Sequence, residues 1–211
     1  MTTTTDPLPR GARIDGLLLA GGRSRRFGRD KRRALLGGRT LADIAIAKLR
    51  AVVDGDLWIA GAGTFEARGR AFLVDDLVRG RGPLSGIAGG LMRTSFGILV
   101  LPCDVPLVGL DTLSALTRMA RRCGRVVALR SMRGWEPLVA FYPRTAFPQI
   151  AAALREGQGA PHRLLERLGA LALPVGRTDE MCNVNRVEDL TAASDARGDG
   201  RGLRRRERTK R

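Results

Sequence analysis

A glycine-rich segment with several cations follows the first apolar run of the chain. It reads Leu19-Ala20-Gly21-Gly22 and continues through Arg26 to Lys31. Two glycines directly after a strand let the backbone turn and approach a ligand closely, and exposed N–H groups there can hold phosphate oxygens. Arg26 and Lys31 would add charge-assisted contacts. The spacing matches neither the Walker A loop nor the G-x-G-x-x-G fingerprint. We interpret the segment as a phosphate-binding loop of another kind; a tight turn with a solvated basic loop is the alternative.

Carboxylates also follow apolar runs: the pair Asp75-Asp76 follows the run at 71–74, and Asp104 follows the run at 98–101. Asp104 comes after the run at 98–101 and the pair Pro102-Cys103. Mg²⁺ usually takes only one or two protein carboxylates together with substrate phosphates, which suits a site with few acids. Asp104 is therefore a candidate Mg²⁺ ligand. Aspartate is also common at turns and caps, which is the alternative for Asp76 and Asp104.

Two asparagines near the C-terminus, Asn183 and Asn185, stand at alternate positions. In an extended segment both side chains point to one side. Amide groups offer donors and acceptors without charge, which suits a ligand with a mixed donor and acceptor edge. A pair of Asx turns before a helix is the alternative interpretation.

The remaining reactive residues exclude several classes of protein. The chain has one histidine, His162, and three widely spaced cysteines. These numbers exclude a histidine-rich metal cluster, a zinc site and a disulfide scaffold, and reduced thiols indicate a cytoplasmic protein. Cys103 has no histidine near it in sequence, so we interpret it as a small buried residue and not as a nucleophile. The sequence shows no Ser-His-Asp or Cys-His set, so a neutral nucleophile would lack an evident general base, whereas a nucleophile that is already an anion needs none.

Strands and helices alternate along the chain with short connections. Apolar runs predict strands over 14–20, 57–60, 71–74, 98–101, 126–129, 138–142 and 171–175. Helical spacing predicts helices over 40–53, with Thr40 as N-cap, 83–94, 111–123, 145–155, 161–168 and from 187. Continuous apolar strands indicate burial on both faces. The predicted fold class is α/β, with a doubly wound, mainly parallel, Rossmann-like sheet and helices on both faces. Such sheets bind ligands at the carboxyl ends of their strands.

The 211 residues carry a formal charge of +16, and most of the excess lies in two segments. Residues 23–33 hold seven basic residues and one acid, and residues 197–211 hold eight and two. Aromatic residues make up 4 %, and none is interleaved with these runs, so a nucleic-acid partner is not expected. We predict a disordered leader over 1–13, a single domain over 14–193 and a basic, disordered tail over 194–211. No apolar run is long enough to span a membrane.

Several segments together resemble the molybdenum cofactor guanylyltransferase family, within the MobA-like NTP transferases. Residues 19–31 match its signature L-A-G-G-x-S-x-R-M-G-x-D-K except at Phe27, where the family usually has methionine. The family elements G-P-L-A-G, P-C-D-x-P, E-P-L and N-V-N resemble the segments at 82–86, 102–106, 136–138 and 183–185, in that order. The resemblance spans residues 14–193.

The resemblance implies a nucleotidyltransferase that transfers GMP from GTP to the terminal phosphate of Mo-loaded molybdopterin and releases pyrophosphate. It implies Mg²⁺ as cofactor, GTP and molybdopterin as substrates, and transient contact with molybdoenzymes or cofactor-insertion proteins. Lys31, Arg26 and Asp104 would be catalytic, with Asp104 on the metal. The implied nucleotide-binding residues are Leu19, Ala20, Gly21, Gly22, Lys31, Asp76 and Asp104, and the implied pterin-binding residues are Asn183 and Asn185. A monomer is expected for one domain of this size.

Departures from the family pattern leave alternatives open. Ala60-Gly61 stands where the family often has asparagine near the nucleotide, and Arg186-Val187 replaces Thr-Pro after N-V-N. A molybdopterin cytidylyltransferase or another small NTP transferase is the nearest alternative. A non-catalytic cofactor carrier or polyanion-binding protein is the alternative from another class.

Overall fold

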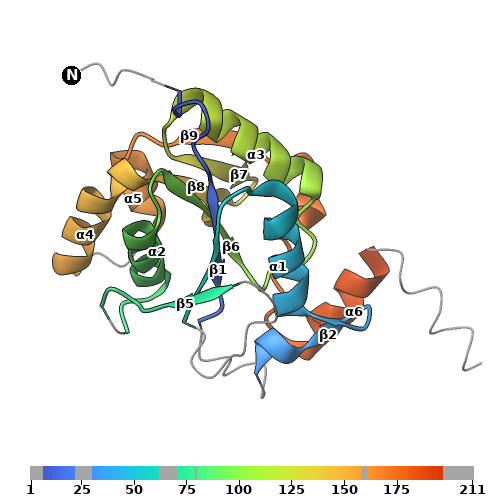
Figure 1. Ribbon diagram of the computed structural model, residues 1–211. Coiled ribbons are helices and arrows are strands. Elements are labelled where there is room, and N and C mark those ends of the chain that lie inside the picture. The colour runs from blue at the N-terminus through green and yellow to red at the C-terminus, as the bar shows by residue number, and fades with distance from the viewer. Residues whose placement is uncertain (1–6, 22–29, 62–70, 79, 158–160, 197–211) are drawn as a thin grey trace, which may run out of the picture.

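A seven-stranded sheet forms the centre of the computed structural model, which describes residues 7–21, 30–61, 71–78, 80–157 and 161–196 (Figure 1). The strands lie in the order β5-β4-β1-β6-β8-β7-β9. Neighbouring strands are parallel except for β8, which runs antiparallel to β6 and β7. The strands are β1 (Asp15–Leu19), β4 (Leu57–Ala60), β5 (Phe72–Val74), β6 (Gly97–Pro102), β7 (Val127–Ser131), β8 (Gly134–Pro143) and β9 (Leu171–Pro174).

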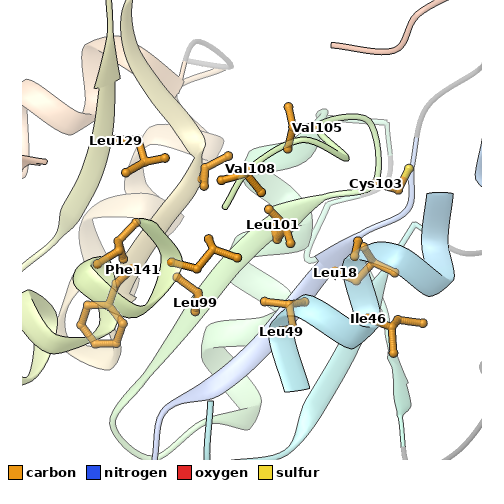
Figure 2. Packing of buried hydrophobic residues seen from close by; sticks show 14 of the residues in the cluster. Leu18, Ile46, Leu49, Leu99, Leu101, Cys103, Val105, Val108, Leu129 and Phe141 are labelled. Atoms are coloured by element: carbon orange, nitrogen blue, oxygen red, sulfur yellow. The ribbon is translucent and has the colours of Figure 1, made fainter. Parts of the chain in front are cut away.

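Both faces of the sheet are apolar. Successive side chains of a strand point to opposite faces, and consecutive residues of the central strands are apolar. Leu17 and Leu19 of β1 pack on one face, and Leu18 packs on the other. Leu99 and Leu101 of β6 lie in the same packed layer as Leu18, as Figure 2 shows. The continuous apolar runs of the central strands thus follow from burial on both sides.

Helices cover the two faces separately (Figure 1). The face of Leu18 packs against α1 and α3, and Ile46 and Leu49 of α1 lie in that layer (Figure 2). The face of Leu17 packs against α2, α4 and α5. These helices are α1 (Leu41–Val52), α2 (Pro83–Arg93), α3 (Leu110–Cys123), α4 (Phe147–Arg155) and α5 (Pro161–Arg167), and the short turn η2 (Arg144–Ala146) precedes α4.

A small unit beside the sheet joins the early and late parts of the chain. Its elements are the turn η1 (Lys31–Arg33), the hairpin β2 (Leu35–Leu36) and β3 (Arg39–Thr40), and α6 (Val187–Ala196). The turn η3 (Thr178–Met181) comes shortly before α6, and its Met181 packs in the layer of Leu18. Leu36, Ile44, Val184 and Ala193 share one packed cluster. Because η1 leads directly into this hairpin, the cluster holds Lys31 near the segment that precedes α6.

The predicted fold class is confirmed: the sheet is mainly parallel, and helices cover both faces. The helix predicted over 40–53 begins after Thr40, whose hydroxyl accepts a hydrogen bond from Asp43 N at 3.0 Å, as an N-cap should. The strands predicted over 126–129 and 138–142 are longer and form an antiparallel hairpin. The hairpin β2–β3 was not predicted, because two-residue strands carry no readable periodicity.

Several predicted features concern the ends of the chain and its isolated reactive residues. Residues 1–6 of the predicted leader and residues 197–211 of the predicted tail lie outside the described residues. The described remainder of the leader is ordered, because Leu8 N donates to Arg121 O of α3 at 2.9 Å and Ala12 is buried. Residues 194–196 of the predicted tail form the end of α6. Within the described ranges, no helix is long and apolar enough to cross a membrane. The three cysteines are free, and His162 is exposed at the start of α5.

Candidate active site

The carboxyl ends of β1, β4 and β6 meet at one edge of the sheet, and the loops after them line a cavity. β1 pairs with β4 on one side and with β6 on the other, so the order in which the chain adds strands reverses beside β1. This edge is therefore a topological switch point, where such sheets bind ligands. The cavity has a volume of about 510 Å³, within the roughly 300–1,000 Å³ usual for small-molecule sites. We call it the larger cavity; its lining includes Leu19, Gly21, Gly61, Cys103 and Asp104.

The loops after β1 and β4 pass each other backbone to backbone. A Cβ atom on Gly61 would lie 2.5 Å from Gly21 Cα, which is closer than real Cβ contacts come. Gly61 also has a φ of +70°, in the left-handed region that favours glycine. Just before this crossing, Ala20 N donates a hydrogen bond to Ala60 O at 2.9 Å. Glycine at position 61 is therefore required by both close approach and backbone conformation.

A lysine and an aspartate from distant parts of the chain pair at the larger cavity. Lys31 Nζ donates to Asp104 Oδ2 at 2.9 Å and to Asn185 Oδ1 at 3.1 Å. The side chains of Lys31 and Asp104 keep only 15 % and 25 % of their exposure, so solvent screens this pair less than a surface ion pair. One ammonium group thus joins η1, the loop after β6 and the segment before α6.

Further hydrogen bonds fix the two segments that carry Lys31 and Asp104. The Asp30 carboxylate caps η1 by accepting from Arg32 N at 3.1 Å and Arg32 Nε at 2.8 Å. The hydrogen bond from the Arg32 side chain lowers the pKa of Asp30. On the other side, Val184 N donates to the backbone carbonyl of Asp104 at 2.8 Å. The segment before α6 is therefore tied to the loop after β6 by the main chain, independently of the Asp104 carboxylate.

Cys103 lies beside Asp104 and lines the same cavity. Burial, together with the neighbouring Asp104 charge, raises the pKa of its thiol to about 12. The thiol is therefore not ionised near neutral pH and is a poor nucleophile. This agrees with the interpretation of Cys103 as a small buried residue.

Asp76 brings a second carboxylate to the larger cavity, from the segment between β5 and α2. Burial and the nearby charge of Asp75 raise the pKa of Asp76. A Cβ atom on Gly86 of α2 would lie 2.8 Å from Ala60 Cβ and 3.3 Å from Asp76 Oδ1. The absence of a side chain at Gly86 therefore leaves space beside the Asp76 carboxylate, which can accept hydrogen bonds from N–H groups of a ligand.

A smaller cavity of about 300 Å³ lies against the segment before α6. Asn183 and Asn185 both line it, together with Arg133 from the turn between β7 and β8. The backbone N–H groups of Asn185 and the next residue donate to Asp189 Oδ2, both at 2.7 Å, and these bonds lower the pKa of Asp189. Because Lys31 of the larger cavity contacts Asn185 of the smaller one, the two cavities adjoin at this contact.

Comparison with known proteins assigns this arrangement to a family. Residues 16–172 match the family model described as the MobA-like NTP transferase domain. The chain belongs to the MobA-like NTP transferase family. A molybdenum cofactor guanylyltransferase from Pseudomonas syringae pv. syringae is 34 % identical over 188 residues, which cover 86 % of this chain and 93 % of that protein. The resemblance drawn from the motifs is confirmed, and the chain is a nucleotidyltransferase.

Solved structures share the fold of this MobA-like transferase. The molybdopterin-guanine dinucleotide biosynthesis protein A of Archaeoglobus fulgidus superposes with a TM-score of 0.75 at 23 % identity, over 88 % of this chain and all of that one. A protein from Mycobacterium tuberculosis H37Rv, solved as a complex with manganese, superposes with a TM-score of 0.58 at 21 % identity. That superposition covers 78 % of this chain and 88 % of the mycobacterial one.

The structure brings together most of the residues predicted for the MobA-like site. The larger cavity is lined by Leu19, Gly21, Lys31, Asp76 and Asp104, and the smaller one by Asn183 and Asn185. Ala20 is buried, and its N–H group donates to Ala60 O. It therefore stabilises the end of β1 and does not line the larger cavity. Gly22 and Arg26 lie outside the described residues.

Sequence reasoning missed three contributions to this site. Gly61 was noted only as a departure from the family, although a glycine directly after a strand signals close backbone approach. Arg133 reaches the smaller cavity through a hairpin turn that the sequence did not predict. The contact between Lys31 and Asn185 spans 154 positions and has no local signal.

The acidic groups of the site fit a divalent ion that arrives with phosphates. Among the described residues, no group of three or more His, Cys, Asp or Glu side chains is placed to hold a metal. A protein cage for a resident ion is thus not built from these residues. A single carboxylate such as Asp104 fits an ion whose other ligands are substrate phosphates and water.

We expect Gly61→Ala to weaken both the fold and nucleotide binding. The left-handed backbone alone costs an alanine about 1–2 kcal/mol, and the approach to Gly21 adds a clash. Gly38→Ala is the matched control, because Gly38 has a φ of +77° with no atom within 4 Å of an added Cβ. Thermal denaturation should show the larger loss for Gly61→Ala, and the Kd for nucleoside triphosphate should rise about tenfold in that variant only. Equal effects of the two variants would contradict a role for the close approach.

Proposed function

We propose that the protein transfers GMP from GTP to the terminal phosphate of molybdopterin, forming the guanine dinucleotide cofactor and pyrophosphate. The observation that carries this proposal is the contact of Lys31 with both Asp104 and Asn185, which places one cation where two cavities adjoin. An enzyme that joins two phosphorylated substrates gains most of its rate from holding them next to each other. The family and the guanylyltransferase relatives support the choice of substrates.

GTP would occupy the larger cavity. Gly21 lines this cavity and would offer its backbone N–H group to the phosphates. Gly22 and Arg26 are proposed from the sequence as further phosphate contacts. Asp76 would accept hydrogen bonds from the N–H groups of the guanine ring, because an ionised carboxylate is an acceptor only. Leu19 forms part of the apolar wall.

Molybdopterin would occupy the smaller cavity. The amides of Asn183 and Asn185 line it and can pair with the mixed donor and acceptor edge of a pterin. Arg133 at the same cavity adds a positive charge for the acceptor phosphate. Lys31, which contacts Asn185, would lie where that phosphate approaches the nucleotide.

In the proposed reaction, an oxygen of the acceptor phosphate attacks the α-phosphorus of GTP. A new P–O bond forms, the bond from the α-phosphorus to the oxygen bridging to the β-phosphate breaks, and that oxygen leaves with pyrophosphate. No proton has to be removed from the nucleophile, so no side chain needs to act as a general base. Lys31 would neutralise charge that gathers on the phosphates in the transition state, in a site partly shielded from water.

We propose Mg²⁺ as the divalent ion and Asp104 as its protein ligand. Bound Mg²⁺ would offset the charge of the triphosphate and of the departing pyrophosphate. Lys31 holds the Asp104 carboxylate at the cavity wall. Its ammonium would be shared between this carboxylate and the phosphates when substrates are present.

The raised pKa of Asp76 predicts a pH dependence of GTP use. The pKa lies above the ordinary 3.8 because burial and Asp75 disfavour the charged form. As the pH falls through this raised pKa, protonation removes an acceptor for guanine, so kcat/KM for GTP should fall at a higher pH than an ordinary aspartate would produce. Asp76→Asn should lower kcat/KM about tenfold at neutral pH and remove this acidic limb. GTP itself titrates equally with the native protein and with Asp76→Asn. If the fall of kcat/KM at acidic pH were the same in the variant, the titrating group would be GTP and not Asp76.

Two labelled nucleotides test the direction of transfer. With GTP labelled at the α-phosphate, the label should move to the pterin product, and with GTP labelled at the γ-phosphate it should leave as pyrophosphate. Label from the α-position that stays in free GMP would indicate hydrolysis and contradict the proposal. Binding of the pterin with no movement of label would favour a carrier.

We further propose that the enzyme acts in the cytoplasm as a monomer. The catalytic domain would span 14–193. Transient contact with a molybdoenzyme or a cofactor-insertion protein would deliver the product. The free cysteines Cys103, Cys123 and Cys182 are compatible with a reducing compartment.

A further inference from the structure

A buried glutamate, Glu180, lies outside the site described so far. Its side chain keeps only 6 % of its exposure. Glu180 Oε1 accepts a hydrogen bond from Gly109 N at 3.2 Å, and the Thr112 hydroxyl lies 3.0 Å and 2.8 Å from the two carboxylate oxygens, one of which it can donate to at a time. A buried carboxylate is costly unless it is well hydrogen-bonded, so these contacts call for an explanation.

The partners of Glu180 belong to the first turn of α3. Gly109 is the N-cap of α3 and supplies no capping side chain of its own. A Cβ atom on Gly109 would lie 2.6 Å from Glu180 Oε1, so glycine there admits the carboxylate. The N-terminus of a helix favours a negative charge. The Glu180 carboxylate therefore caps the start of α3 in place of a side chain at Gly109. Glu180 lies 70 residues after the first residue of α3, so this cap is a tertiary contact.

This cap fastens the segment that leads into the smaller cavity. Glu180 lies in η3, three residues before Asn183. From there the chain makes the Val184 bond to the Asp104 carbonyl and the Asn185 contact with Lys31. The same segment thus has one anchor on α3 and another on the loop after β6.

We propose that Glu180 is a positioning residue for the acceptor half of the site. Its carboxylate fixes the segment over 180–185 against α3, so that Asn183 and Asn185 face the smaller cavity at the correct distance from Lys31 and Asp104. This inference rests on the proposed function for the identity of the acceptor, and on the hydrogen bonds alone for the anchoring itself.

The alternative is a cap that only stabilises α3 and leaves the site unaffected. Asp54 provides the control, because its carboxylate also joins distant segments: it accepts from Ile14 N at 2.9 Å and from the Arg121 side-chain atom Nη2 at 2.8 Å. Asp54 lies in the loop before β4, at the amino ends of the strands and away from both cavities. Asp54→Ala therefore removes a carboxylate tether without touching the site.

Steady-state kinetics should separate the two roles. In Glu180→Ala the KM for molybdopterin should rise about tenfold while the KM for GTP stays within about twofold, because only the acceptor segment loses its anchor. Glu180→Gln should recover most of the effect, since its amide oxygen can still accept from Gly109 N. Asp54→Ala should leave both constants unchanged. Equal changes in the two KM values, or a rise no larger than in Asp54→Ala, would overturn the proposal.

Amide hydrogen exchange tests the anchoring without turnover. The Val184 amide should exchange faster in Glu180→Ala than in the native protein, and α1 should be unaffected. If the native protein does not use GTP, the proposed function fails, and faster exchange at Val184 would still support the anchor. Unchanged exchange at Val184 in the variant would overturn it.

Discussion

Replacing Asp104 by alanine is expected to lower the rate of guanylyl transfer at least 100-fold, the scale for losing one preorganised charge at a reacting centre. The variant should also lose the dependence of the remaining rate on Mg²⁺, because Asp104 is the proposed protein ligand. The fold should persist, since Val184 N bonds to the Asp104 backbone carbonyl and not to its carboxylate. Initial rates over a range of Mg²⁺ concentrations, with circular dichroism as a check on folding, give the measurement.

Asp111→Ala is the control for this experiment. Asp111 is an exposed carboxylate in the first turn of α3, seven positions from Asp104, and it does not line either cavity. Its removal should leave the rate and the Mg²⁺ dependence as they are. A folded Asp104→Ala enzyme that is still activated by Mg²⁺ would refute the role given to Asp104.

The second large effect is expected for Lys31→Met. Methionine keeps much of the length of the side chain and removes the ammonium that contacts Asp104 and Asn185. The transition state then loses a fixed positive charge, and kcat should fall roughly 100-fold. Because the ammonium serves both cavities, the KM values for GTP and for molybdopterin should both rise, unlike the selective effect expected for Glu180.

Arg93→Met provides the comparison for Lys31. Arg93 is an exposed cation at the C-terminal end of α2, and it lines neither cavity. Its loss changes the net charge of the protein by the same amount as the loss of Lys31. If Arg93→Met slowed the reaction as much as Lys31→Met, general electrostatic attraction of anionic substrates would explain the result, and a local role for Lys31 would be wrong.

The sheet and its helices could be predicted from the sequence because their signals are local. The runs at Leu57–Ala60 and Leu171–Pro174 are apolar and short, and the helical spacing along α1 begins after a clear N-cap, Thr40. The antiparallel direction of β8 could not be predicted, because an apolar strand reads the same in either direction. The hairpin β2–β3 was missed for a different reason: its strands are two residues long and are held by tertiary packing.

The candidate site was predictable to the extent that its residues follow strands. Gly21, Asp76 and Asp104 each follow an apolar run within three residues, and strand order brings them to one cavity. Asn185 could be singled out by the family motif, but its contact with Lys31 depends on how α6 packs against the hairpin. Glu180 gave no signal, since a buried glutamate and a surface glutamate look alike in a sequence.

The most direct test of the central claim is the release of pyrophosphate with Mg²⁺, Mo-loaded molybdopterin and GTP, CTP, ATP or UTP in turn. The account predicts release with GTP and little with the other three nucleotides. Release with CTP in place of GTP would keep the fold and the chemistry but contradict the guanylyl assignment, with Ala60 and Gly61 as the first residues to examine. No release with any nucleotide, from folded protein, would contradict the claim that this chain performs the transfer.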